Sequence, residues 1–175
     1  MRRIIVTSVV ALLCAAGAAQ SQTTQSQTTQ AQTSPAQTTP AQTTPAPSAG
    51  DIVAGRKAAF DLSAVAFGSL KTASEAATPD PQSLQFGASA LGRWAKALPG
   101  LFPAGTSATD LPGQTTASPA IWADRADFEA KAAAYAAAAD RLSELSGDIA
   151  AYKTQLGVVN DTCRSCHSVY RVRPG

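Results

Sequence analysis

A long apolar run, an excess of charge of one sign and an alternating strand pattern are all missing from this 175-residue sequence. Its one apolar run, residues 4–14, is shorter than the roughly 20 residues that a membrane-spanning helix needs. Lysine and arginine total 14 against 12 acidic residues, and two of the basic residues, Arg2 and Arg3, stand at the extreme N-terminus. The remaining charges balance, so we expect no nucleic-acid partner and no membrane-surface role driven by charge.

Residues 1–19 have the layout of a secretory signal peptide. Arg2 and Arg3 precede the apolar run and small residues follow it, with cleavage expected after Ala18 or Ala19. An uncleaved membrane anchor stays open as an alternative. Cys14 could carry a lipid, but Leu13 precedes it where a lipoprotein signal has a small residue. We therefore expect Cys14 to leave with the signal peptide and the mature protein to be periplasmic, an oxidising compartment.

Residues 20–50 are expected to be a disordered spacer. A five-residue repeat of Gln, Thr, Ser, Ala and Pro fills residues 21–45, without a charged, aromatic or large aliphatic side chain. Such a composition cannot bury enough apolar surface to offset the entropy lost on ordering. The spacer could tether the following domain near a membrane, or it could be neutral drift in a tolerant terminus.

Residues 51–175 are expected to form one domain, because their apolar side chains recur at helical spacing. The pattern predicts four helices, at about 51–77, 84–98, 118–147 and 149–170. Ser118-Pro119 is typical of the cap and first turn of a helix and starts the third, and Asp148 can cap the fourth. Long helices whose apolar residues recur every three or four positions predict an all-α fold, an antiparallel four-helix bundle.

A Cys-x-x-Cys-His motif lies near the end of the fourth predicted helix, at Cys163, Cys166 and His167. On a helix, Cys166 lies roughly 60° and His167 roughly 40° from Cys163, so all three share one face. Two thiols that can add to vinyl groups, followed by an imidazole that can bind iron, form the signature of c-type haem attachment. Because this face continues the apolar stripe, we expect the haem to be inserted into the bundle core.

Two other interpretations of the motif fit the sequence less well. A thiol–disulfide centre usually follows a strand in a βαβ unit, and this sequence has no such unit. A structural zinc site needs four ligands, whereas the mature chain offers two cysteines and one histidine. We therefore expect one covalently bound haem c, with His167 as the metal ligand.

The second axial position of the iron has no ordinary ligand in this chain. Met1 is the only methionine and His167 the only histidine, so His/Met and bis-His ligation within one mature chain are excluded. Lysine stays open as an uncommon ligand. We expect a five-coordinate, high-spin iron whose vacant position binds small diatomic gases such as nitric oxide and carbon monoxide.

Over residues 51–173 the sequence resembles the cytochrome c′ family, the four-helix c-type cytochromes. The resemblance rests on the C-terminal motif with Tyr170 and Arg171, on Pro119-Ala120-Ile121-Trp122, on Leu101-Phe102-Pro103, and on Arg56 followed by Phe60. The repeat-containing spacer departs from the usual family pattern. The resemblance also implies a homodimer that pairs through the first two helices.

The resemblance implies roles for three further residues. Phe60 would shield the vacant face of the iron, at the position where low-spin relatives have a ligating methionine. The alternative role of Phe60 is plain core packing. Arg56 would lie near a haem propionate; its alternative is a solvated surface charge. Arg171, four residues after His167, would tune the proximal ligand electrostatically.

These features predict a periplasmic haem protein that binds nitric oxide or carbon monoxide, with dioxygen stabilised poorly in a pocket without hydrogen-bond donors. The alternative is a one-electron carrier that exchanges electrons with a redox partner protein, a role that the missing sixth ligand weakens. Catalysis such as peroxidase activity is the weakest interpretation, because no distal histidine can act as acid and base. We therefore expect no enzyme.

Overall fold

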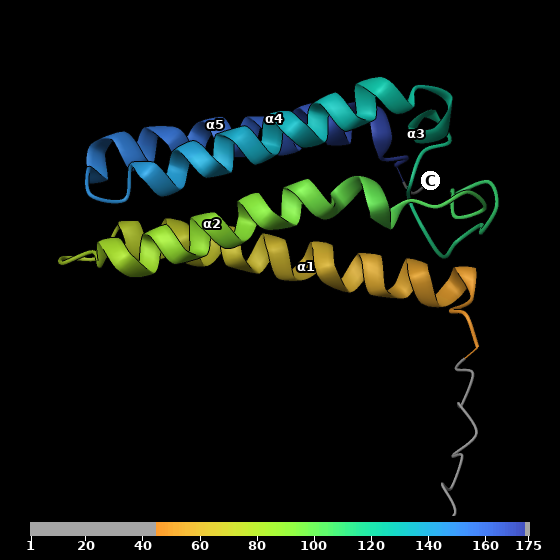
Figure 1. The fold of residues 1–175 in the computed structure, drawn as a ribbon, viewed down its shortest axis with the longest axis horizontal. Helices are drawn as coiled ribbons and strands as arrows, with labels where there is room; N and C mark the ends of the chain where they lie inside the picture. The colour runs from red at the N-terminus through yellow and green to blue at the C-terminus, as the bar shows by residue number, and fades with distance from the viewer. Residues whose placement is uncertain (1–44, 174–175) are drawn as a thin grey trace, which may run out of the picture. The chain divides into compact units, whose positions relative to one another are not determined.

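The computed structural model describes residues 45–173, which form the helices labelled in Figure 1. The elements are α1 (Ala49–Ser74), α2 (Pro81–Ala97), the 3₁₀ helix η1 (Leu98–Leu101), α3 (Ala120–Ala123), α4 (Arg125–Glu144) and α5 (Ile149–Tyr170). The four long helices form the predicted all-α bundle, with α4 and α5 lying above α1 and α2 in the view of Figure 1. The expected signal peptide with Cys14, and most of the expected spacer, lie outside the described residues.

Side-chain caps set the starts of α1, α2 and α5. Ser48 and Asp51 form a reciprocal capping box, with the Asp51 amide 3.1 Å from Ser48 Oγ. This box starts α1 two residues earlier than predicted, inside the stretch expected to be spacer. Asp80 accepts hydrogen bonds from the first turn of α2, and Asp148 caps α5 as predicted.

The prediction of one continuous third helix was wrong. The chain leaves the helical region at Asp124 (φ −129°, ψ 71°), which separates the one-turn α3 from α4. The Asp124 carboxylate accepts a hydrogen bond of 3.0 Å from the Asp127 amide and so caps α4. Aspartate favours this arrangement because its short side chain competes with the helical backbone for hydrogen bonds.

The centre of the bundle lies between α2 and α4. These two helices pack together most extensively, whereas α1 and α5 meet at few points. Fully buried side chains from three helices fill the interior: Leu84, Leu91, Leu142, Tyr152 and Val159. No helix within residues 45–173 is both long and apolar enough to cross a membrane.

Gly87 on α2 permits the close approach of α1, because a Cβ there would lie 2.6 Å from Leu70 Cδ2. We expect Gly87→Ala to lower the free energy of unfolding by about 1–3 kcal/mol through overpacking. Gly157 on α5 has open space around its Cα, so Gly157→Ala should raise it by up to about 1 kcal/mol through helix propensity. Urea unfolding of both variants measures this, and equal effects of the two substitutions would contradict the packing account.

Candidate functional site

The last two turns of α5 carry the Cys-x-x-Cys-His motif. The thiols of Cys163 and Cys166 are free and half-buried, and both residues pack against the hydrophobic core. His167 lies roughly 40° around the helix from Cys163 and is exposed. The two cysteines thus point toward the core, whereas the imidazole is accessible to solvent. Helices α1 and α5 make few direct contacts in this bundle.

Both thiols stand in surroundings that keep them protonated. Burial raises the pKa of Cys163 and of Cys166. At Cys166 the charge of Cys163 raises the pKa further, while Lys131 on α4 lowers it and Asp127 raises it. A redox-active thiol normally has a lowered pKa, because the thiolate is the nucleophile. The electrostatics therefore do not favour a thiol–disulfide exchange centre.

His167 keeps a neutral imidazole more readily than a free histidine. Desolvation by the surrounding protein lowers its pKa, and the positive charge of Arg171 lowers it further. Only neutral imidazole has a lone pair for a metal ion. His167 also faces an open surface pocket of about 310 Å³ that it shares with Ser168, Arg171, Val172 and Arg173.

The C-terminal end of α5 is fastened to its neighbours on both sides. The buried Tyr170 donates a hydrogen bond of 2.6 Å from its hydroxyl to Asp127 Oδ2 on α4, and its ring packs edge-on against Phe128 at 5.3 Å. Burial and this hydrogen bond raise the pKa of Tyr170, so the phenol stays protonated as the donor. On the other side, the Ser118 amide donates to the Tyr170 carbonyl at 2.9 Å.

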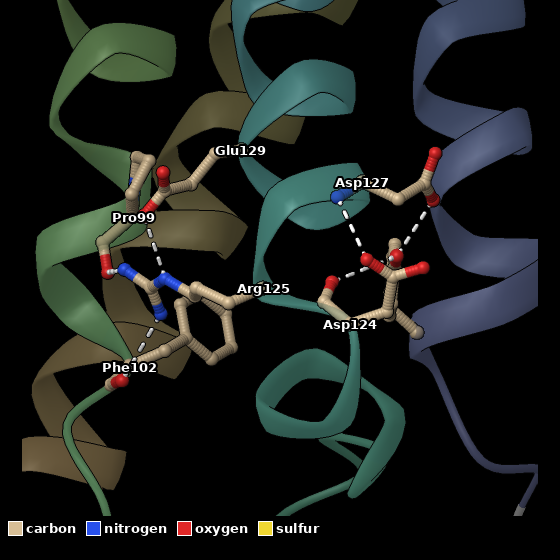
Figure 2. A network of polar contacts seen from close by, with 7 residues as sticks. Pro99, Phe102, Asp124, Arg125, Asp127 and Glu129 are labelled. Atoms are coloured by element: carbon tan, nitrogen blue, oxygen red, sulfur yellow. Dashed lines mark hydrogen bonds and ion pairs between the residues drawn. The ribbon is translucent and has the colours of Figure 1, made fainter.

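Arg125, at the start of α4, holds the same end of the bundle together (Figure 2). Its guanidinium donates to the Pro99 carbonyl at 2.7 Å and to the Phe102 carbonyl at 3.4 Å, and it pairs with Glu129 at 2.7 Å. These contacts join α4 to η1 and to the residue that follows it. Arg125 and Asp127 were not predicted from the sequence, because the apolar periodicity of a helix does not identify which polar residues contact other helices.

Arg56 is 3 % exposed, so the alternative of a solvated surface charge is wrong. Its guanidinium donates to Thr106 Oγ1 at 3.0 Å, to the Thr106 carbonyl at 2.9 Å and to Thr115 Oγ1 at 2.9 Å. It also lies 4.4 Å above the ring of Phe102. Desolvation lowers its pKa, and within residues 45–173 no carboxylate forms an ion pair with it. A buried cation without an anion is costly, which makes this position attractive for an acidic ligand group.

Phe60 packs against the hydrophobic core as part of an aromatic cluster, so its expected role beside the iron stays a prediction. Its ring meets Trp94 edge-on at 5.3 Å and Phe102 at 6.2 Å, and Phe102 in turn contacts Trp122 and Phe128. The cluster reaches Tyr170 through Phe128 and so joins the Phe60 side of α1 to the end of α5. Trp94 was overlooked in the sequence, although its spacing places it beside the α2 stripe.

The indole N–H groups of Trp94 and Trp122 provide a test of whether haem fits here. Both are buried, and neither has a hydrogen-bond acceptor within the described residues. Buried donors are normally satisfied, so these two suggest that a bound group supplies acceptors. Haem has carboxylates for such donors and for Arg56, an apolar ring that suits the aromatic cluster, and vinyl groups for the two thiols. The residues present therefore fit haem.

A four-helix bundle with Cys-x-x-Cys-His near the end of its last helix defines a four-helix c-type cytochrome. The model of the family described as cytochrome c′ matches residues 51–171. The chain is 37% identical over 128 residues to a cytochrome c′ of Cereibacter sphaeroides, covering 70% of this chain and 83% of that protein. It is also 37% identical over 110 residues to a cytochrome c-556 of Agrobacterium tumefaciens, covering 62% and 86%.

A solved structure of a cytochrome c′ point mutant from Alcaligenes xylosoxidans, in complex with nitric oxide, superimposes with a TM-score of 0.62. It is 27% identical, and the match covers 71% of this chain and 97% of that one. The chain belongs to the cytochrome c′ family, whose members carry covalently bound haem c.

The bond between Tyr170 and Asp127 should be measurable in a double-mutant cycle. We expect Tyr170→Phe and Asp127→Ala each to destabilise the protein, with a coupling energy of about 1.5–3 kcal/mol, as for hydrogen bonds to charged groups. Urea unfolding of the wild type, both single variants and the double variant gives this value. Additive effects would mean that the short contact contributes nothing specific.

Proposed function

We propose that Cys163 and Cys166 attach one haem through thioether bonds, that His167 binds its iron, and that the other axial position is vacant and takes nitric oxide or carbon monoxide. The observation that carries this proposal is that the motif holds the chain's single histidine, while Phe60 and its aromatic neighbours offer no ligating atom. When bound, haem supplies the iron as the gas-binding centre. The nitric oxide complex of the Alcaligenes xylosoxidans relative supports the proposal.

The chain's own residues would set access and orientation at this centre. Phe60, held edge-on by Trp94 and Phe102, would exclude large ligands from the vacant face. Arg56 would face a propionate, since it is buried and has no acidic partner among the described residues. Arg171 would keep His167 neutral through its positive charge.

Trp94, which packs against Phe60 at 5.3 Å, has a buried indole N–H without an acceptor in the described part of the chain. If a haem carboxylate accepts this hydrogen bond, the indole N–H is not available to a gas at the iron. Poor stabilisation of dioxygen stays a prediction, and nitric oxide and carbon monoxide are the proposed ligands.

A second function, one-electron transfer, is favoured by the exposure of His167. An exposed axial ligand gives a short route from the iron to a partner at the surface. The two functions are compatible in one protein, and neither requires enzymatic turnover. We further propose that residues 1–19 direct export to the periplasm and that the repeat-containing spacer separates residues 51–175 from the export signal or from a membrane.

Absorption spectra of the purified protein test the haem proposal directly. We expect a high-spin spectrum in both oxidation states that changes when carbon monoxide or nitric oxide is added. Cys163→Ser/Cys166→Ser should lose haem under denaturing conditions, because both thioether bonds are gone. A low-spin spectrum that ignores carbon monoxide would contradict the vacant position and would make electron transfer the better function.

Phe60→Met should convert the iron to a low-spin, six-coordinate state by placing a thioether on the distal side. We expect this variant to lose most carbon monoxide binding, whereas the control Phe60→Leu should stay high-spin and bind the gas. Optical titration with carbon monoxide measures both. If Phe60→Met remains high-spin, Phe60 does not lie opposite His167.

We also propose a homodimer that pairs through α1 and α2. Three large apolar side chains project from these helices into solvent: Leu62 (70 % exposed), Val65 (66 %) and Phe86 (72 %). Side chains of this size are costly to leave in water, and a second copy would cover them at a self-complementary interface.

Replacing Leu62 and Phe86 by lysine should weaken dimerisation by at least about two orders of magnitude, since each buried side chain of this size contributes about 1.5–3 kcal/mol. Sedimentation equilibrium measures the association. Val158→Lys on α5, where the valine is 45 % exposed, serves as the matched control and should leave the dimer intact. A wild-type protein that is monomeric at high concentration would contradict the interface.

A further inference from the structure

The surface around His167 carries an unusual local charge. Residues 162–175 contain three arginines, Arg164, Arg171 and Arg173, and no acidic residue, although acidic and basic residues balance in the chain without Arg2 and Arg3. All three arginines are exposed. None of them forms an ion pair within residues 45–173, where the ion pairs involve other cations. Their charge is therefore available to a partner.

The fold gathers these arginines into one surface. Arg164 and Ser168 lie roughly 40° apart around α5, and Arg171 directly follows the helix. After the helix ends, the Val172 amide donates to the Thr116 carbonyl at 2.8 Å, and Arg171 forms a bridge with Ala117. This pairing fixes Arg173 beside the pocket that it shares with His167. We call this set the C-terminal basic surface: Arg164, His167, Ser168, Arg171, Val172 and Arg173.

The acidic residues at the start of α4 and on the neighbouring turn of α5 form no ion pair with these arginines within residues 45–173. Asp161 lies one turn before Arg164 on α5 but forms no ion pair with it in the described part of the chain. Asp127 on α4 is engaged by the Tyr170 hydroxyl at 2.6 Å and by Lys131 at 3.8 Å. Asp124 caps α4 through its carboxylate. A positive rim thus surrounds an accessible imidazole and a partly exposed valine.

We infer that the C-terminal basic surface is the docking site of an acidic redox protein, which exchanges electrons with the haem past His167. The inference rests on the proposed haem ligation. An exposed imidazole within a charged rim fits a transient protein interface, in which complementary charge accelerates encounter. Anionic lipid is the less suitable partner, because membrane-binding patches usually gather four to eight basic residues and this surface has three.

A labelled hepta-glutamate peptide tests docking without relying on the iron. We expect Arg164→Gln/Arg173→Gln to weaken peptide binding about tenfold at low salt, measured by fluorescence anisotropy on the haem-loaded protein. The matched control is Lys71→Gln/Lys153→Gln, which removes the same charge and should bind like wild type. Lys71 stands in the last turn of α1 and Lys153 near the start of α5, and these helix ends lie at the other end of the bundle from the C-terminus (Figure 1). Equal weakening in both variants would overturn the inference.

Ferricyanide, a small anionic oxidant, tests electron exchange at the same surface. Stopped-flow oxidation of the reduced protein should slow about tenfold between about 10 and 200 mM ionic strength. This dependence should be largely lost in Arg164→Gln/Arg173→Gln and retained in the lysine control. The role in electron transfer would be overturned if the peptide binds but the two variants show the same ionic-strength dependence of oxidation. It would also be overturned if the protein binds phosphatidylglycerol vesicles and not the peptide. A protein without covalent haem would instead refute the proposed function, and the peptide titration would still report on the surface.

Discussion

The short hydrogen bond from Tyr170 to Asp127 is the contact on which this end of the bundle depends. It fixes the last turn of α5 against α4, three residues after His167 and four after Cys166. The ring of Tyr170 lies on Phe128, which leads through Phe102 to Phe60 and Trp94. A displacement of this turn would therefore disturb the motif and the aromatic cluster together.

The same turn organises the long loop between η1 and α3. The break at Asp124 ends α3 and lets the preceding chain return past α5, where Ser118 and Thr116 bond the backbone of residues 170–172. Arg56 holds the other side of this loop by donating to Thr106 and Thr115. One buried guanidinium thus links α1 to a loop that is bound to α5 at its far end, so the two helices that make few direct contacts are coupled through the loop.

The number, order and approximate limits of the long helices could be predicted because periodicity and capping residues are local signals. Asp148 marks the start of α5 in the sequence as it does in the structure. The helix break at Asp124 could not be predicted, since an aspartate within an alanine-rich stretch has no local feature that distinguishes a cap from a solvated side chain. The Cys-x-x-Cys-His motif could be recognised because haem attachment requires these residue types at this spacing. The burial of Arg56 could not be predicted, because nothing in the sequence distinguishes a buried arginine from an exposed one. The two indole N–H groups, which have no acceptor within residues 45–173, also arise only from the packing of α1, α2, α3 and the loop.

The residues of the motif lie close together around α5 but differ in their surroundings. Inward, Cys163 and Cys166 face apolar and aromatic side chains, where water is scarce and a neutral diatomic gas is not disfavoured by polarity. His167 is exposed to solvent beside Arg171 and Arg173. The positive charge of these arginines attracts an anionic protein surface but does not attract a neutral gas. The buried thiols suit the proposed gas binding, and the exposed imidazole suits the proposed electron exchange. A bundle that buries the thiols and exposes the imidazole can serve both without a compromise between them.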